Sequence, residues 1–139
     1  MIKGKEIVFI DTGVFKALVD GNDDFHNKAV KIWKRLETEK VVLLTTNYVI
    51  DETFTLIRVR CGLEKVKQLK KILVQSTETI KFVRITAEDE MNSWRWFEKD
   101  WSKLSMTDCV SFAVMKRLKI KRAASFDKHF KRAGFSLEK

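Results

Sequence analysis

The sequence predicts an α/β domain whose parallel sheet is covered by helices on both faces. Short apolar runs alternate along the chain with longer segments in which apolar residues recur at helical spacing. The first two runs, Ile7–Ile10 and Val41–Leu44, are apolar throughout, as expected for strands buried on both faces. No linker, repeat or low-complexity segment interrupts the pattern, so we expect residues 1–139 to form a single domain.

The remaining strands are predicted from weaker patterns. Residues 80–85 alternate apolar and basic side chains, which is typical of a strand near a sheet edge. A short strand is expected at 122–126, and a last one at 135–137.

The helices are predicted from apolar spacing and from capping residues. Val14 begins the first helical pattern, and Asn22–Asp24 predicts a cap for a second helix over 25–36. Thr45–Asn47 predicts the cap of a third helix, which Gly62 ends. Further helices are expected at 63–75, 88–101 and 106–118, with a short one from Lys128.

The chain is strongly basic. It carries 28 Lys and Arg against 19 Asp and Glu, a net charge of +9, which favours a polyanionic partner such as nucleic acid. The alternative is that charge of both signs only keeps the protein soluble or reflects a hot habitat. No apolar run approaches the roughly 18 residues of a membrane helix, and no secretory signal precedes the first strand, so we expect a cytoplasmic protein.

The cysteines and histidines do not suggest a zinc site or a hydrolytic triad. Cys61 and Cys109 lie far apart without ligand spacing, and each is expected to be a small buried hydrophobic residue. His26 and His129 are isolated from any nucleophile.

Two acids directly follow predicted strands. Asp11 ends the first strand, at the edge where open α/β sheets bind ligands, and Asp127 follows the predicted strand at 122–126. Each of them has a structural alternative, because Asp often caps the helix that comes next.

Two further acids lie at the beginnings of helices. Glu52 shares its helical row with Val49 and Leu56, so it borders the buried side, whereas Asp51 belongs to the solvated face. A carboxylate near a core is costly unless it is paired or bound to metal, which singles out Glu52. Asp108 follows Ser105 at the spacing of a capping box, and that role alone explains it well.

The four acids Asp11, Glu52, Asp108 and Asp127 together predict a metal site. A parallel layout brings such strand and helix ends to one edge, where the carboxylates repel one another and raise one another's pKa values. Mg²⁺ and Mn²⁺ prefer oxygen ligands, and two such ions would balance four charges. Two-metal carboxylate sites catalyse in-line displacement at phosphorus.

These residues carry a resemblance to the PIN-domain ribonucleases, including the VapC-type toxins, over nearly the whole chain. The motifs are Ile10-Asp11-Thr12, Asp51-Glu52-Thr53, Ser105-Met106-Thr107-Asp108 and Ser125-Phe126-Asp127-Lys128-His129-Phe130. The last two, separated by a helix of suitable length, are the more specific pair.

The resemblance implies a three-layer α/β/α fold, with the four acids binding Mg²⁺ or Mn²⁺ for cleavage of single-stranded RNA. It also implies a homodimer and inhibition by a small antitoxin protein. Thr12 and Thr107 match hydroxyl positions that support the acids or a metal-bound water. Gly13 departs from the polar residue that many relatives carry there.

Three other functions are considered. A catalytically silent PIN-like module would bind RNA or a protein without cutting, but all four acids are present. Phosphatases that form an aspartyl phosphate usually carry a second Asp two residues on, where this chain has Gly13. A DNA nuclease stays open, because the contact to the 2′-hydroxyl is not visible in a sequence.

The surfaces used for partners are left open by the sequence. Trp94, Trp96 and Trp101 lie in one segment, either packed on the core or exposed for a partner. Positive charge is spread over several predicted surfaces, and no subset is singled out for phosphate contact. The basic residues concerned are Arg58, Arg60, Lys116, Arg117, Lys119, Lys121, Arg122, Lys128, Lys131 and Arg132.

Overall fold

The computed structural model describes residues 5–139, and their strands form one five-stranded sheet in the order β3-β2-β1-β4-β5. Every neighbouring pair is parallel, so the prediction of a mainly parallel sheet is confirmed. The alternating strand lies at an edge, as expected. The strands are β1 (Ile7–Ile10), β2 (Val42–Thr46), β3 (Ile80–Val83), β4 (Arg122–Ala124) and β5 (Ser136–Leu137).

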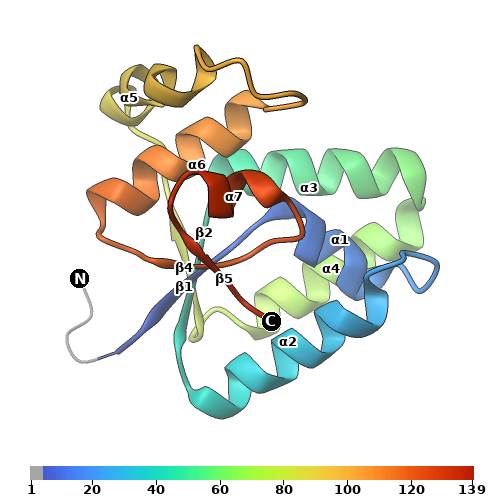
Figure 1. Cartoon of the computed structure of the whole chain (residues 1–139). Coiled ribbons are helices and arrows are strands. Elements are labelled where there is room, and N and C mark those ends of the chain that lie inside the picture. Colours follow the sequence, from blue (N-terminus) through green and yellow to red (C-terminus); the bar gives the residue numbers. More distant parts are fainter. Residues whose placement is uncertain (1–4) are drawn as a thin grey trace.

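Helices cover both faces of the sheet and complete the three-layer α/β/α arrangement. In Figure 1, α5 and α6 lie above the strands and α2 lies below them. Helix α7 contacts α6, and α1 contacts α2 and α4. Helix α3 contacts α6 as well as α1 and α4. The helices are α1 (Thr12–Val19), α2 (His26–Glu39), α3 (Asn47–Arg60), α4 (Leu63–Gln75), α5 (Ala87–Phe97), α6 (Met106–Arg117) and α7 (Lys128–Arg132).

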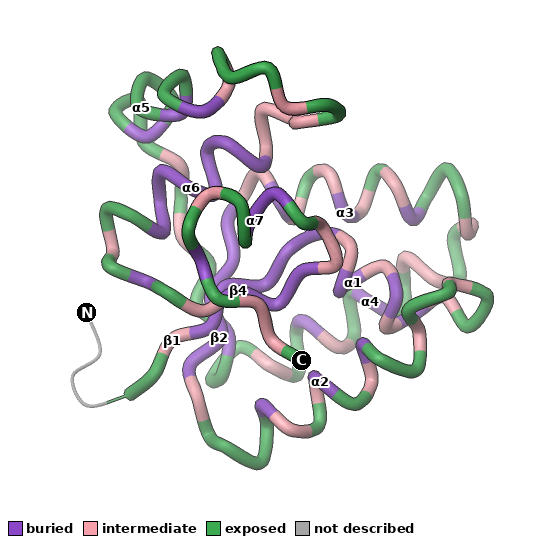
Figure 2. The backbone as a smooth tube through the Cα atoms, viewed as in Figure 1, coloured by how far each residue is buried: buried purple, intermediate pink, exposed green. Residues whose placement is uncertain are grey.

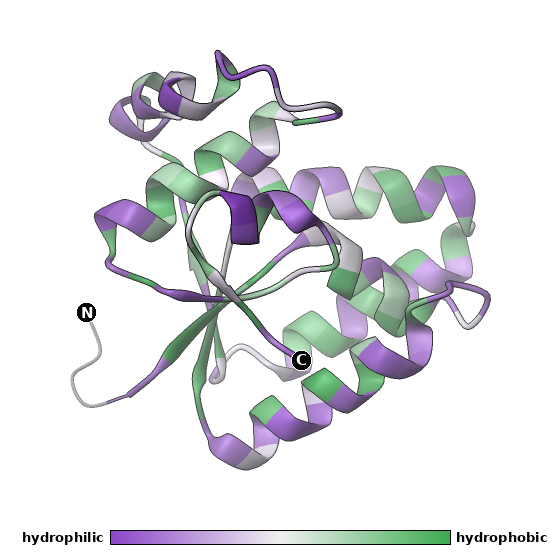
Figure 3. Ribbon diagram, viewed as in Figure 1, coloured by the Kyte–Doolittle hydropathy of each residue, from purple (hydrophilic) through white to green (hydrophobic). Residues whose placement is uncertain are grey.

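The core lies on the central strands. All five residues of β2 and the last three of β1 are buried, which explains why their sequences are apolar without alternation. Figure 2 shows these strands as the buried centre of the chain, and Figure 3 shows hydrophobic strands between helices with polar outer faces.

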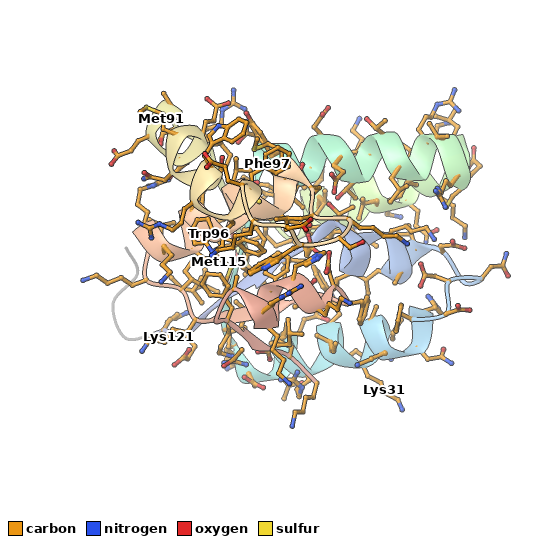
Figure 4. The ribbon with its side chains drawn as sticks, turned by 45° about the horizontal axis from the view of Figure 1, so that its top comes forward. Lys31, Met91, Trp96, Phe97, Met115 and Lys121 are labelled. Atoms are coloured by element: carbon orange, nitrogen blue, oxygen red, sulfur yellow. The ribbon has the colours of Figure 1, made fainter. Side chains whose placement is uncertain are left out.

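Helix α6 joins the upper layer to the sheet. Its Phe112 is fully buried and makes aromatic contacts with Trp96, Phe130 and Phe135, which belong to α5, α7 and the segment before β5. In Figure 4, Trp96 and Met115 lie in the interior, while Lys31 and Lys121 project outward. This cluster holds α6 and α7 together.

Several local predictions differ from the structure, and the strand predicted at 80–85 ends at Val83. The helix predicted at 88–101 ends at Phe97, and Trp101 lies in the segment that follows. Strand β4 stops at Ala124, because Ser125 turns the chain and accepts a hydrogen bond from the Asp127 amide. The expected cap of α2 is also wrong.

The acids before α2 bind other groups. Phe25 occupies the N-cap position of α2 and makes no side-chain capping bond. The Asp23 carboxylate accepts a hydrogen bond from the Phe25 amide and pairs with Lys16, which also binds Asp20. These contacts fix the loop that carries Phe25.

Other predictions concern single side chains. Cys109 is buried as expected, whereas Cys61 is only half-buried. Trp96 is buried, Trp101 is half-buried, and Trp94 is exposed. None of the helices formed by residues 5–139 combines the length and the apolar character needed to cross a bilayer.

We predict that Phe112→Ala lowers the free energy of unfolding by about 3–5 kcal/mol, because it leaves a cavity where three elements meet. Urea denaturation measures the change. The matched control is Phe82→Ala on β3, where the ring is 46% exposed, and its cost should be below about 1 kcal/mol. Equal costs for the two variants would contradict this account of the core.

Candidate active site

Asp11 is held at the end of β1 and is not used as a helix cap. It occupies the N-cap position of α1, but its side chain makes no capping hydrogen bond. Instead, Asp11 Oδ2 accepts a hydrogen bond of 2.8 Å from the Ser125 hydroxyl, and its amide donates to the Ala124 carbonyl. The capping alternative for Asp11 is therefore wrong, and the residue is only 6% exposed.

Asp108 does form the predicted capping box. Its amide donates to Ser105 Oγ at 3.0 Å, and its Oδ2 accepts from the Ser105 amide at 3.3 Å. The residue is nevertheless 7% exposed at the start of α6. A capping role and a role in the site are thus compatible, because one carboxylate oxygen is left for other partners.

Asp127 and Glu52 complete the group of acids. Asp127 caps α7 through a bond of 2.9 Å from the His129 amide to its Oδ1. Glu52 is half-buried on α3, whereas its neighbour Asp51 is exposed, as the helical rows indicated. The structure places the acids Asp11, Glu52, Asp108 and Asp127 around one cavity of about 790 Å³.

Burial and mutual repulsion raise the pKa values of two of these acids. Burial, followed by the charge of Asp108, raises the pKa of Asp11 to about 7, although the Ser125 hydroxyl and the Thr12 amide favour its charged form. Burial, followed by the charge of Asp127, raises the pKa of Asp108 to about 6, and Glu52 adds to the effect. The cavity therefore disfavours its own negative charge in the absence of a cation.

His129 is a member of this site that the sequence analysis missed. It is 3% exposed, and its Nδ1 lies 2.8 Å from Asp127 Oδ1 and 4.0 Å from Asp108 Oδ2. Within residues 5–139 neither ring nitrogen has a hydrogen-bond partner of good geometry. The ring is parallel to Trp101, 6.1 Å away between centroids. The available signal was its position two residues after Asp127 at the start of a short helix.

The donor atoms fit a hard divalent cation. Asp108, Asp127 and His129 can offer ligand atoms that all lie within 4.8 Å of one another. Asp11 and Glu52 line the same cavity, and the buried Thr12 hydroxyl there has no hydrogen-bond partner among the described residues. Thr107 borders a neighbouring hollow instead. Carboxylates with raised pKa values and polar atoms without partners are typical of a cation site in the absence of its ion.

Comparisons with known proteins agree on one family. The profile of the PIN domain family matches residues 8–136. A protein from two strains of Mycobacterium tuberculosis, CDC 1551 and H37Rv, is named "23S rRNA-specific endonuclease VapC20". It is 32% identical to this chain over 130 residues, which cover 93% of this chain and 95% of the relative.

Solved structures show the same fold. The crystal structure of M. tuberculosis VapC20, described as a sarcin-ricin loop cleaving toxin, has a TM-score of 0.78 at 33% identity and covers 92% of this chain and 95% of its own. VapBC2 from Rickettsia felis, bound to promoter DNA, has a TM-score of 0.69 at 12% identity, covering 95% and 97%. The structure of FitAcB from Neisseria gonorrhoeae has a TM-score of 0.65 at 16% identity and covers 95% of this chain and 96% of its own. At such identities the last two show the fold alone.

We predict that Asp108→Asn stabilises the metal-free protein at pH 8 by about 1–2 kcal/mol. An aspartate whose pKa is raised on folding favours the folded state below its folded pKa. Wild-type stability therefore falls as the pH rises from about 4 to 7. The amide oxygen of Asn keeps the capping bond while the charge is lost, and denaturation in EDTA at pH 4 and pH 8 measures the difference.

The control is Asp51→Asn, which alters an exposed acid on α3 and should leave stability unchanged at both pH values. A clear loss of stability in Asp108→Asn at pH 8 would reduce Asp108 to a helix cap.

Proposed function

This chain belongs to the PIN domain family, and we propose that it is a divalent-metal-dependent endoribonuclease that cleaves single-stranded RNA. The resemblance to the VapC type, predicted from four motifs, is confirmed by a relative and a solved structure at 32–33% identity. The observation that carries the proposal is one cavity that brings together Asp11, Glu52, Asp108 and Asp127, two of them with raised pKa values. A fifth acid on its wall, Asp23, is already paired with Lys16.

The substrate we propose is an unpaired loop of ribosomal RNA. Support comes from the relative, whose name specifies 23S rRNA, and from the structure described as cleaving the sarcin-ricin loop. The net charge of +9 favours such a polyanion. A ribosomal substrate would place the activity in the cytoplasm.

The metal we propose is Mg²⁺ or Mn²⁺, held by Asp11, Glu52, Asp108 and Asp127. When bound, such ions would activate the attacking water and stabilise the charge that develops on the phosphate. The imidazole of His129 offers a further ligand atom beside Asp108 and Asp127.

The chain's own contribution is to hold these oxygens in place. The Ser125 hydroxyl donates to Asp11 and accepts from the Asp127 amide, so one side chain sets the spacing between two acids. Ser105 fixes Asp108 through the capping box. A site held by such bonds needs little rearrangement when the substrate phosphate arrives.

Within this proposal, residues 1–139 act as one nuclease domain. Support comes from the family profile, which spans residues 8–136, and from a single hydrophobic cluster that runs from Val8 to Phe135. The alternative is a catalytically silent module that binds RNA or a protein, and the complete set of acids speaks against it.

The partners we propose are an antitoxin protein and a second copy of the chain. The proposal of an antitoxin partner is supported by the description of the similar VapC20 structure as a toxin. A hollow on α3, where Tyr48, Leu56 and the largely exposed Val59 lie among polar residues, is the surface we propose for the second copy.

We predict that the purified protein cleaves a mixed single-stranded RNA with Mn²⁺ or Mg²⁺ and not with EDTA. The double variant Asp11→Asn/Asp108→Asn should lose at least about a hundredfold in rate, since it removes two of the proposed ligands. Gel analysis of end-labelled RNA and of its DNA counterpart measures the rates.

The matched control is a pair of neighbouring substitutions on α3. Glu52→Gln should lose activity, while Asp51→Asn should keep it. Equal activity in the double variant and the wild type would place the site elsewhere, and silence of the wild type on ribosomal RNA would favour the non-cleaving module.

A further inference from the structure

Two phenylalanines from distant parts of the sequence form a stacked pair at the rim of the acidic cavity. Phe25 precedes α2, and Phe126 lies in the turn between β4 and α7. Their rings are nearly parallel at 10°, with centroids 4.5 Å apart. Phe25 remains 45% exposed although Phe126 stacks on one face of its ring.

The stacked pair separates two hollows. Phe25, Phe126 and Lys128 line the cavity that contains the four acids, and the same three residues line a second hollow of about 630 Å³. A chain that leaves the acids along this side must therefore pass over the two rings.

The second hollow is positively charged. Its lysines make no ion pair within residues 5–139, and its one acid, Glu138, is already bound by Arg35 and Arg122. Of the basic residues noted in the sequence, Lys128 and Lys131 thus face a common hollow, whereas Arg117 and Arg122 are occupied in ion pairs. The lysines of the hollow are Lys28, Lys128, Lys131 and Lys139.

Gly13 lies beside the pair. A Cβ atom at this position would lie 3.8 Å from the Phe126 ring, at ordinary van der Waals distance. The amino group of Lys28 lies 5.8 Å from the centre of the same ring. Phe126 thus has neighbours on its other sides, while Phe25 stays accessible.

This combination matches the repeating chemistry of a single strand of nucleic acid. Non-specific single-strand sites combine flat aromatic side chains, on which bases stack, with a groove of positive charge that follows the phosphates. Here the acids mark the position of the phosphate that is cut, and the phenylalanines provide a flat surface beside it. The lysines of the second hollow provide positive charge on the far side of the rings.

We propose that Phe25 and Phe126 form a stacking platform for an unpaired base next to the cleaved phosphate, and that the lysine hollow binds the phosphates that follow. The inference rests on the proposed function and deepens it. It commits to single-stranded RNA as the occupant, because unpaired lysines match phosphates and an exposed aromatic face matches an unstacked base.

The platform is tested by RNA binding without cleavage. The probe is a fluorescein-labelled uridine octamer with one central 2-aminopurine, and the protein is the full-length Asp11→Asn/Asp108→Asn variant in EDTA. Adding Phe25→Ala or Phe25→Leu should weaken binding by about 5- to 100-fold. Leu keeps an apolar contact with Phe126 but has no flat face. Phe25→Trp should retain affinity and the quenching of 2-aminopurine.

The matched control is Phe82→Ala, which removes an equally exposed ring from β3, away from both hollows, and should leave affinity unchanged. Unweakened binding by Phe25→Leu and Phe25→Ala would overturn the platform. Metal-dependent cleavage, measured for the wild type and for Phe25→Leu with all four acids intact, distinguishes failure of the platform from failure of the proposed nuclease. Cleavage that survives Phe25→Leu unchanged rejects the platform alone, whereas no cleavage by the wild type rejects the proposed nuclease.

The lysine path is tested by salt dependence. Each phosphate contact with a single strand contributes about −0.7 to the slope of log K against log salt concentration. Lys131→Ala should therefore flatten the slope by about that amount. Lys81→Ala on β3 is the control and should not change it. Identical slopes for the two variants would remove Lys131 from the path.

Discussion

The repulsion among buried carboxylates at the carboxyl edge of the sheet is the constraint to which the rest of the site responds. Asp11 and Asp108 are almost fully buried, and burial raises the pKa of each, with a further rise from the charges of neighbouring carboxylates. Such a cluster is unfavourable for the chain alone and becomes favourable when cations enter it. The free energy that this costs the fold is offset by the core beneath, where β1 and β2 are buried on both faces.

The hydrogen bonds around the acids keep them close despite this repulsion. Ser125 connects Asp11 to the Asp127 amide, and Ser105 binds Asp108 at both ends of the capping box. Thr45 donates from β2 to the carbonyl of Ile10, directly before Asp11. Each bond is local or lies between neighbouring strands, so the geometry of the acids follows from the register of the sheet. The stacked rings of Phe25 and Phe126 extend this rigid edge toward a positively charged surface.

Much of this architecture was predictable because its signals are local. Continuous apolar runs identified β1 and β2, and the acids at element ends follow from a parallel sheet. His129 and Phe25 were not predictable in the same way. The ring of His129 lies near Asp108 through the packing of α6 against α7, in which Phe112 contacts Phe130. Phe25 and Phe126 are distant in the sequence and come together only in the folded chain. Trp101 lies outside α5, which ends at Phe97, four residues earlier than predicted.

The central claim is that four carboxylates form one cation site, and calorimetric titration with Mn²⁺ tests it most directly. At pH 6.5 we expect binding that releases protons, since Asp11 and Asp108 are partly protonated before the ion enters. The heat should then vary with the ionisation enthalpy of the buffer, and Glu52→Gln should bind about tenfold more weakly than Asp51→Asn. Absence of binding at millimolar Mn²⁺, or equal affinity of these two variants, would contradict the claim.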